Sequence, residues 1–333
     1  MAKQKEKIYK RRRPFRAAAK GLGIALLITI ILLTVVFFWF PRYIVHTPDG
    51  IRLDVPFLRG ILDEIPEIIE EPTVPPPDTS RPDPIEPDAP PFSAYVTTGE
   101  GALSTINWVE RLESMDATAI VITTTEQDGT LLWNSGASLA TRFALHGEMD
   151  FIPTLGRVSS GTSVGAVISA FYSPLLAARN APIALNGGFL DPESAEVRTF
   201  IQEISVELAE MGFSEIILAN IILPPEYSAP TSDAMTLALF TSLSAELSRR
   251  GVALSVMVDE TAWIVSEDET SLLRMISRNI TRFYTELSPE TLADNAAWNT
   301  LNAAVAEILG EESARFIPVG PAEYRRAGNW AIR

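Results

Sequence analysis

The chain has no cysteine and only two histidines, His46 and His146, among its 333 residues. The lack of cysteine excludes disulfide bonds, thiolate zinc sites and cysteine nucleophiles together. With two histidines, neither a histidine-rich metal site nor serine–histidine–aspartate catalysis is expected. Much of the chemistry of metalloproteins and hydrolases is therefore excluded by composition alone.

Positive charge is scarce beyond the first twenty residues. The formal net charge is −15, but residues 1–20 hold nine Lys/Arg against the single acid Glu6, a net of +8, so the other 313 residues carry −23. Binding to the phosphate backbone of a nucleic acid requires a basic face. We therefore expect no nucleic-acid partner for the main body of the chain.

Signatures of nucleotide and calcium sites are also missing. The segment 156–163 has a spacing similar to a phosphate-binding loop, but Thr162 stands where that loop needs lysine. No loop of the form D-x-D-x-D-G, which would hold calcium, occurs in the sequence. The sequence therefore predicts neither a cofactor nor a metal.

One long apolar run lies near the N-terminus, GLGIALLITIILLTVVFFWF, residues 21–40. Its twenty residues would form a helix about 30 Å long, which matches the hydrocarbon thickness of a bilayer. The run is too long for a cleavable signal peptide and has no small-residue cleavage site after it. Because the basic residues 10–13 precede it, we expect a signal-anchor with the tail 1–20 in the cytoplasm and all later residues extracytoplasmic.

Two further segments separate this predicted span from the rest of the chain. Residues 41–71 contain a hairpin signal at Asp49-Gly50, followed by a short amphipathic stretch that Pro66 interrupts. Residues 72–91 contain nine prolines in twenty positions, which favours extended polyproline II. At ~3.1 Å per residue this stalk would span roughly 60 Å. A role as a spacer is a better interpretation of this segment than a role as a ligand for proline-binding domains, which are mostly intracellular.

Residues 92–333 alternate between strand and helix periodicity. Helices are expected at 106–115, 138–145, 162–171, 193–211, 232–250, 269–278 and 289–309. Eight strands are expected, at 92–98, 118–125, 149–155, 181–186, 215–223, 252–258, 280–284 and 315–319, the fifth of them interpreted as an apolar strand covered on both faces. Eight strands alternating with helices in 242 residues predict a (β/α)₈ TIM-barrel-like domain. A doubly wound open sheet is the alternative, since alternation alone does not establish closure.

Several segments resemble a bacterial family of uncharacterised, membrane-anchored proteins assigned as TIM-barrel glycoside hydrolases. The strongest similarity is FLDPESAEVRTFIQEISVELAEMGFSEIILANIILPP, residues 189–225. Weaker similarities are the strand 94–97 with 119–122, the loop 129–135, and the ending Gly328-Asn329-Trp330. The resemblance implies a barrel that acts on glycans.

The same resemblance shows departures at the positions that carry the family's polar groups. Ala219 and Asn220 stand where the family has Asp and Tyr, and Ile222 where it has Arg. Thr123 stands in place of another Asp, and Thr125 in place of Lys. Most glycosidases need two carboxylates, one to protonate the leaving oxygen and one as nucleophile or base. The resemblance therefore implies a degenerate form, a pseudoenzyme that has kept the scaffold and lost the family's acids.

Other acids are expected at the carboxyl ends of the strands, where TIM barrels place their active sites. These acids are Glu100, Glu126, Asp128, Asp191, Glu226, Asp259, Glu260 and Glu286. Asp191 and Glu286 are the candidate catalytic pair, which would face each other across the barrel mouth. The structural alternatives are a helix cap for Asp191, a solvated loop for Glu286 and helix-start acids for Asp259 and Glu260.

Aromatic residues near the same strand ends are candidates for stacking against sugar rings. The candidate ligand-binding residues are Tyr95, Trp133, Phe189, Tyr227 and Trp263, together with Asp259 and Glu260. The alternative is that these rings close the core. The sequence thus favours a catalytically impaired barrel that binds a cell-wall polysaccharide, peptidoglycan or a protein partner. An active wall glycosidase using Asp191 and Glu286, or an assembly module without a glycan role, are the rivals.

Overall fold

The computed structural model describes residues 44–47, 50–53 and 91–333, apart from 159–160, 228–229, 265–266 and 327. The chain divides into two units, Met1–Val74 and Pro75–Arg333. Within the described ranges no helix combines the length and apolar character needed to cross a membrane. The tail, the span expected at 21–40 and most of the stalk lie outside those ranges.

The first unit contains an antiparallel pair, β1 (Ile44–Thr47) and β2 (Gly50–Leu53). Its register places Thr47 opposite Gly50 and Ile44 opposite Leu53. This pair lies in the segment where the Asp49-Gly50 signal predicts a hairpin.

The second unit is built on a closed barrel of eight parallel strands, arranged in chain order around the barrel. The strands are β3 (Ser93–Thr98), β4 (Ala119–Thr123), β7 (Ser163–Ser169), β8 (Glu215–Ala219), β9 (Ala253–Asp259), β10 (Phe283–Glu286), β11 (Phe316–Gly320) and β12 (Trp330–Ile332). Closure is completed where β12 pairs with β3, with Ala331 opposite Ala94. The closed ring confirms a TIM-barrel-like domain and excludes the open sheet.

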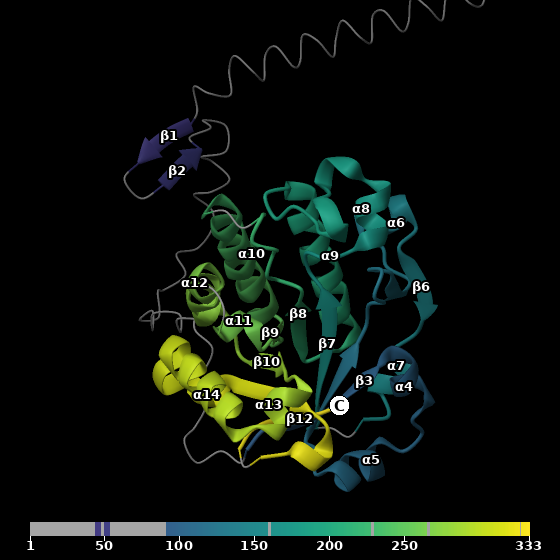
Figure 1. The fold of residues 1–333 in the computed structure, drawn as a ribbon. Coiled ribbons are helices and arrows are strands. Elements are labelled where there is room, and N and C mark those ends of the chain that lie inside the picture. The colour runs from purple at the N-terminus through teal and green to yellow at the C-terminus, as the bar shows by residue number, and fades with distance from the viewer. Residues whose placement is uncertain are drawn as a thin grey trace, which may run out of the picture. The chain divides into compact units, whose positions relative to one another are not determined.

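Helices surround these strands, as Figure 1 shows for α9, α10, α12 and α14. The helices are α4 (Gly99–Ser104), α5 (Trp108–Met115), α6 (Ser138–Phe143), α7 (Ile152–Leu155), α8 (Pro174–Arg179), α9 (Ala195–Met211), α10 (Pro230–Ser248), α11 (Thr261–Ile264), α12 (Glu267–Ile276), α13 (Pro289–Ala293) and α14 (Asn295–Leu309). A small side sheet pairs β5 (Leu131–Trp133) with β6 (His146–Met149). Short 3₁₀ turns are η3 (Ala181–Ile183), η4 (Asn186–Gly188), η5 (Ser277–Asn279), η6 (Gly310–Arg315) and η7 (Ala322–Tyr324).

Helix α9 illustrates how the sequence specifies the outer layer. Its buried side chains recur at helical spacing: Val197, Phe200, Ile201, Ile204, Ser205 and Leu208. The helix ends at Gly212, whose φ of 110° lies in the left-handed region that glycine adopts without strain. The chain then reverses directly into β8.

Two of the eight expected strands are wrong. The expected strand 149–155 contains only the end of β6 and then α7, and β6 lies outside the barrel. The expected strand 181–186 forms η3 and η4, with one isolated bridge between Ala184 and Leu190. Pro182 cannot donate a backbone hydrogen bond, which disfavours a central strand at that position.

Two barrel strands replace them. The segment expected as the helix 162–171 is β7, and β12 is not expected at all. A continuous apolar run such as Val164–Ile168 is compatible with a buried helix or with a strand covered on both faces, and periodicity does not separate them. β12 has only three residues, too few for any periodic signal.

Two large cores hold most of the apolar side chains of the strands, and Trp330 and Ile332 of β12 belong to a small third cluster. One fills the barrel interior and includes Val96, Val121, Ile217, Ile317 and Val319. The other lies between the strands and the helices. Because successive residues of a strand face opposite sides, each central strand contributes to both cores.

We predict that Ile217→Ala in the barrel interior lowers the free energy of unfolding by about 2–5 kcal/mol, because it leaves a cavity in a packed core. Ile217 is fully buried, whereas Ile106, on the outer surface, is 87% exposed. The same change at Ile106 should cost less than about 0.5 kcal/mol. Urea unfolding of the full-length variants, followed by circular dichroism, measures both. Equal effects would contradict the assignment of Ile217 to the core.

Candidate functional site

A cavity of about 680 Å³ opens at the carboxyl ends of β4, β7, β8, β9 and β10. This is the end of the barrel where TIM-barrel proteins place their sites. Its lining side chains come from the strand ends and the loops that follow: Thr123, Thr125, Glu126, Gln127, Val167, Ser169, Tyr172, Phe189, Ala219, Asn220, Ile221, Ile222, Leu223, Pro224, Met257, Val258, Asp259, Thr261, Ala262, Glu286 and Arg333. We call this cavity the mouth cavity.

Two acids at the mouth cavity stand side by side. Asp259 ends β9 and Glu286 ends β10, and the parallel register places them opposite each other. Met257 and Tyr284, two residues earlier, pack inside the barrel. Because strand side chains alternate, Asp259 and Glu286 face the same interior side. Neighbouring strands lie roughly 4.8 Å apart, so the two carboxylates share one region of the cavity.

Glu286 forms an ion pair with Arg333, and both residues line the cavity. Arg333 directly follows β12, and its backbone N–H donates to the carbonyl of Gly320 at 3.1 Å. The Glu286 carboxylate is therefore already engaged by a cationic partner at the cavity wall.

A third acid, Glu126, follows β4. A tight turn positions it, since its N–H donates to the carbonyl of Thr130 at 2.8 Å and its carbonyl accepts from Gly129 at 3.0 Å. Gly129 has a φ of 88°, and an added Cβ would lie within 2.7 Å of the Ser173 backbone. Glycine is required there, both for its backbone angle and for this close approach.

Hydrogen bonds connect the ends of β7 and β8 on the cavity wall. The amide of Asn220 donates to Ser169 Oγ at 2.9 Å, and Ser169 Oγ donates to the Tyr172 carbonyl at 2.5 Å. Asn220 has a φ of 54°, a conformation that asparagine tolerates better than most residues. This turn presents polar groups to the cavity where β8 ends.

One aromatic pair lines the cavity. The rings of Tyr172 and Phe189 lie 5.1 Å apart in an edge-to-face arrangement, and an isolated bridge joins their backbones. Phe189 is a candidate from the sequence, whereas Tyr172 is not. The sequence does not predict Tyr172 as a site residue, because β7, which leads into it, is expected to be a helix.

The positions where the resemblance expects acids also face this cavity. Thr123 at the end of β4 and Ala219 at the end of β8 both line it. Val121 and Ile217, two residues earlier on each strand, point into the barrel. The mouth cavity therefore has a hydroxyl and a methyl group where a carboxylate would otherwise project.

The structure does not bring the candidate catalytic pair together. Glu286 lines the mouth cavity, but Asp191 is not among its lining residues. Asp191 instead accepts a hydrogen bond from the Glu193 N–H at 2.8 Å, close to the start of α9. Since the strand expected at 181–186 is absent, Asp191 belongs to the long connection from β7 to α9. Its observed role is a local turn.

Several candidate ligand-binding residues serve the core instead. Trp133 is buried in β5, and its indole N–H donates to Glu207 at 3.0 Å. Trp263 is buried in α11 and donates to Thr285 Oγ1 at 2.9 Å. These two assignments are corrected, since neither ring is available to a ligand.

Of the other candidates, Asp259 and Phe189 lie at the cavity, and Tyr95, Tyr227 and Glu260 are not among its lining residues. Tyr95 contacts Arg111, whose guanidinium lies 4.9 Å from the ring centre. Glu260 accepts a hydrogen bond from the N–H of Ser288 at 3.0 Å.

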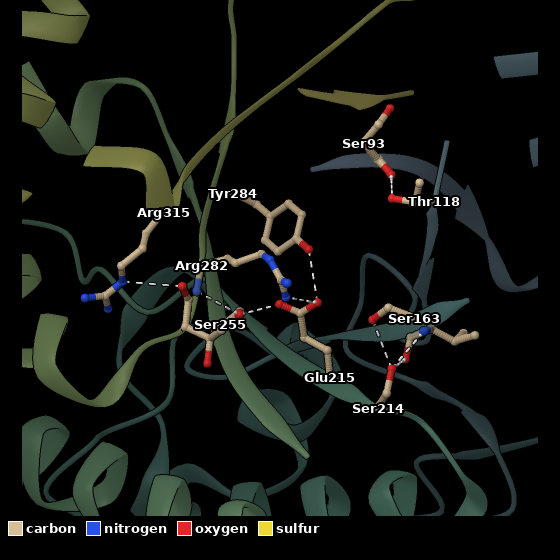
Figure 2. Close-up of polar contacts among 11 residues, drawn as sticks. Ser93, Thr118, Ser163, Ser214, Glu215, Ser255, Arg282, Tyr284 and Arg315 are labelled. Carbon is tan, nitrogen blue, oxygen red and sulfur yellow. Dashed lines mark hydrogen bonds and ion pairs between the residues drawn. The ribbon is translucent and has the colours of Figure 1, made fainter. Parts of the chain in front are cut away.

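A second polar cluster lies inside the barrel at its opposite, amino-terminal end (Figure 2). Glu215, the first residue of β8, is 1% exposed and accepts hydrogen bonds from Ser255 and from Tyr284, the latter at 3.1 Å. Arg282 pairs with the same carboxylate at 3.2 Å, and its guanidinium lies 4.2 Å from the Phe92 ring. We call this cluster the barrel floor. The sequence does not reveal this cluster, because the strand that begins at Glu215 is expected to be apolar on both faces.

The barrel floor is a structural cluster and not a binding site. The described partners of the Glu215 carboxylate satisfy its charge, as a buried ion requires. Burial first, and the negative charge of Glu215 second, raise the pKa of Tyr284 well above its usual value. Tyr284 therefore stays protonated and donates its hydrogen bond.

No protein-family model matches the chain, and no curated protein does. Solved structures with a similar backbone include a hypothetical protein from Ruminiclostridium thermocellum ATCC 27405, with 20% identity over 49% of this chain and 96% of that chain (TM-score 0.42). Aspergillus fumigatus Ega3 in complex with galactosamine shows 13% identity over 72% and 81% (TM-score 0.42). A chitinase from Chromobacterium violaceum ATCC 12472 shows 12% over 69% and 68% (TM-score 0.41). The barrel assignment rests on this chain's own strand pairing.

We predict that alkaline pH destabilises the protein through Tyr284. The folded protein retains the Tyr284 proton to higher pH than the unfolded chain does. Its contribution is therefore fully present below about pH 10 and is lost as the pH rises above that value. Urea unfolding between pH 8 and pH 11 should show a steeper loss of stability for the unmodified chain than for Tyr284→Phe. Parallel losses in the two proteins would contradict this assignment.

Proposed function

We propose that the mouth cavity binds a glycan of the cell envelope and that the chain is impaired in cleaving it. The observation that carries this proposal is the lining of the cavity, which combines an aromatic pair and hydroxyl groups with Ala219 and Thr123 at two strand ends. The volume of about 680 Å³ is within the usual range for a ligand site.

The lining supports recognition of sugars in particular. A sugar ring offers an apolar face and a rim of hydroxyl groups, so it needs a flat partner together with hydrogen-bonding groups. Tyr172 and Phe189 provide aromatic surface. Thr125, Ser169 and Asn220 provide polar groups at the same cavity.

The contacts of the retained acids support impaired cleavage. A glycosidase needs one protonated carboxyl group as its general acid and a second carboxylate as base or nucleophile. The Glu286 carboxylate is engaged by Arg333 and is not free to exchange a proton with a substrate. No carboxyl group projects from Ala219 or Thr123 to replace it.

A second candidate function is residual hydrolysis by Asp259 and Glu286. Their positions on adjacent strands, opposite each other in register and both at the cavity, favour this pair over Asp191 and Glu286. In retaining glycosidases the two carboxyl groups lie about 5 Å apart. Hydrolysis would require a substrate that displaces Arg333 from Glu286.

We further propose that the barrel lies outside the cell, held by the span expected at residues 21–40. The barrel begins with β3 at the amino-terminal end, and the mouth cavity opens at the carboxyl end.

We predict binding without cleavage. Full-length chain in detergent should co-sediment with purified peptidoglycan, and no new reducing ends should be released. Phe189→Ala should weaken binding about threefold to tenfold through lost stacking area. Tyr324→Ala removes a ring that is 41% exposed and is not among the cavity-lining residues, and it should leave binding unchanged.

The same assay separates the alternatives. Reducing-end release that disappears in Asp259→Asn and Glu286→Gln would establish hydrolysis and overturn the impaired state. Failure to co-sediment with peptidoglycan or with any other wall polysaccharide would overturn the glycan function and favour an assembly module.

A further inference from the structure

The charges around the mouth cavity point to one class of glycan. Among its described lining residues, three carboxylates, from Glu126, Asp259 and Glu286, stand against one guanidinium, that of Arg333. We propose that the cavity selects glycans that carry free amino groups, and that Arg333 sets the strength of this selection. This inference rests on the proposed function, since it concerns the ligand of the same cavity.

The ion pair between Arg333 and Glu286 shows that the cavity wall accommodates a cationic group. Asp259 lies opposite Glu286 in the strand register, so a second carboxylate stands next to the one that Arg333 occupies. Glu126 adds a third from the turn after β4. Because Arg333 pairs with Glu286, the carboxylates of Glu126 and Asp259 remain to attract a cationic ligand.

An amino sugar satisfies these conditions where its N-acetylated form does not. A protonated amine next to a carboxylate forms a charge-assisted hydrogen bond. An acetamide carries no charge, so it gains nothing from the acids. Repulsion by these acids weakens binding of a sugar that carries phosphate or carboxylate groups, so peptidoglycan should bind less tightly than a polymer with free amines. The aromatic pair stacks against the ring in either case, so it does not discriminate.

The charge of the whole chain acts in the same direction. Residues 21–333 contain no lysine and carry a net charge of −23. A field of this sign raises the local concentration of a cationic polymer and lowers that of an anionic one. The cavity and the surrounding protein therefore favour the same class of glycan.

The test compares two oligomers of equal length, a glucosamine hexamer and an N-acetylglucosamine hexamer, below the pKa of the sugar amine. Titration calorimetry of the full-length chain in detergent should show tighter binding of the glucosamine hexamer. Asp259→Asn and Glu126→Gln should each weaken that binding by roughly threefold to fivefold, the range of an exposed ion pair. Each substitution should weaken binding of the glucosamine hexamer more than it weakens binding of the N-acetylated hexamer.

Arg333→Gln should change the affinity for the glucosamine hexamer in the opposite direction, which makes it the most informative variant. It releases Glu286, so binding of the glucosamine hexamer should strengthen by roughly threefold. Glu113→Gln, on the exposed outer surface of α5, is the matched control and should change nothing. Thermal melting of each variant checks that the fold is retained. The preference should also fall as salt is added, because salt screens exposed charges.

A second measurement does not depend on affinity. A carbodiimide joins amines to nearby carboxylates, and the absence of lysine from 21–333 leaves few competing amines in the barrel. With the glucosamine hexamer, mass spectrometry should locate the linkage on Glu126 or Asp259. Linkage spread evenly over surface acids would overturn the proposal.

The outcomes separate a failure of the charge selection from a failure of the proposed glycan binding. Equal binding of the two hexamers, or weaker glucosamine binding in Arg333→Gln, would overturn the charge selection and leave glycan binding intact. Absence of binding by both hexamers would overturn both proposals for this class of sugar polymer.

Discussion

The pairing of β12 with β3 is the interaction on which the remaining structure depends. β12 has three residues, yet it joins β11 to β3 and so closes the ring. Two contacts next to it reinforce closure: the Phe92 N–H donates to the Asn329 side chain at 2.6 Å, and the Trp330 N–H donates to the Phe92 carbonyl at 2.9 Å. Without closure, Arg333 would not lie beside Glu286.

The two ends of the barrel use charge in different ways. At the floor, Glu215 is buried among a guanidinium and two hydroxyl groups, and that arrangement fixes the strands. Removal of one partner would leave a buried ion unpaired, which is costly. At the mouth, Asp259 is exposed, and its charge can be satisfied by water or by a ligand. Only the second arrangement leaves interaction energy for binding.

Much of the architecture was predictable, because alternation of strand and helix patterns reflects a layer of helices around parallel strands. The helix 193–211 and the strands around 94 and 120 follow directly from periodicity. β7 was not predictable in this way, because its apolar residues are covered on both faces and carry no alternation. β12 is too short to carry a periodic pattern. The position of Arg333 at the mouth cavity depends on β12 and therefore could not be predicted.

The candidate site was predictable in part for the same reason. Asp259 and Glu286 lie at the ends of strands that periodicity identifies, so they fall at the cavity. Phe189 lies there too, although the strand expected before it is absent. Trp133 and Trp263 illustrate the converse. Their sequence positions close to strand ends do not reveal that each ring turns inward, and only the hydrogen bonds to Glu207 and Thr285 show it.

Binding and hydrolysis make opposite demands on the acids of such a cavity. Hydrolysis needs two carboxyl groups of unequal acidity, one of them protonated at the moment of reaction. Recognition of a cationic sugar needs all of them ionised. Ala219 and Thr123 remove two positions from which unequal acidity could arise, and Arg333 is paired with Glu286. In the proposed function, the residues that impair cleavage therefore also leave a mouth whose remaining charges suit binding.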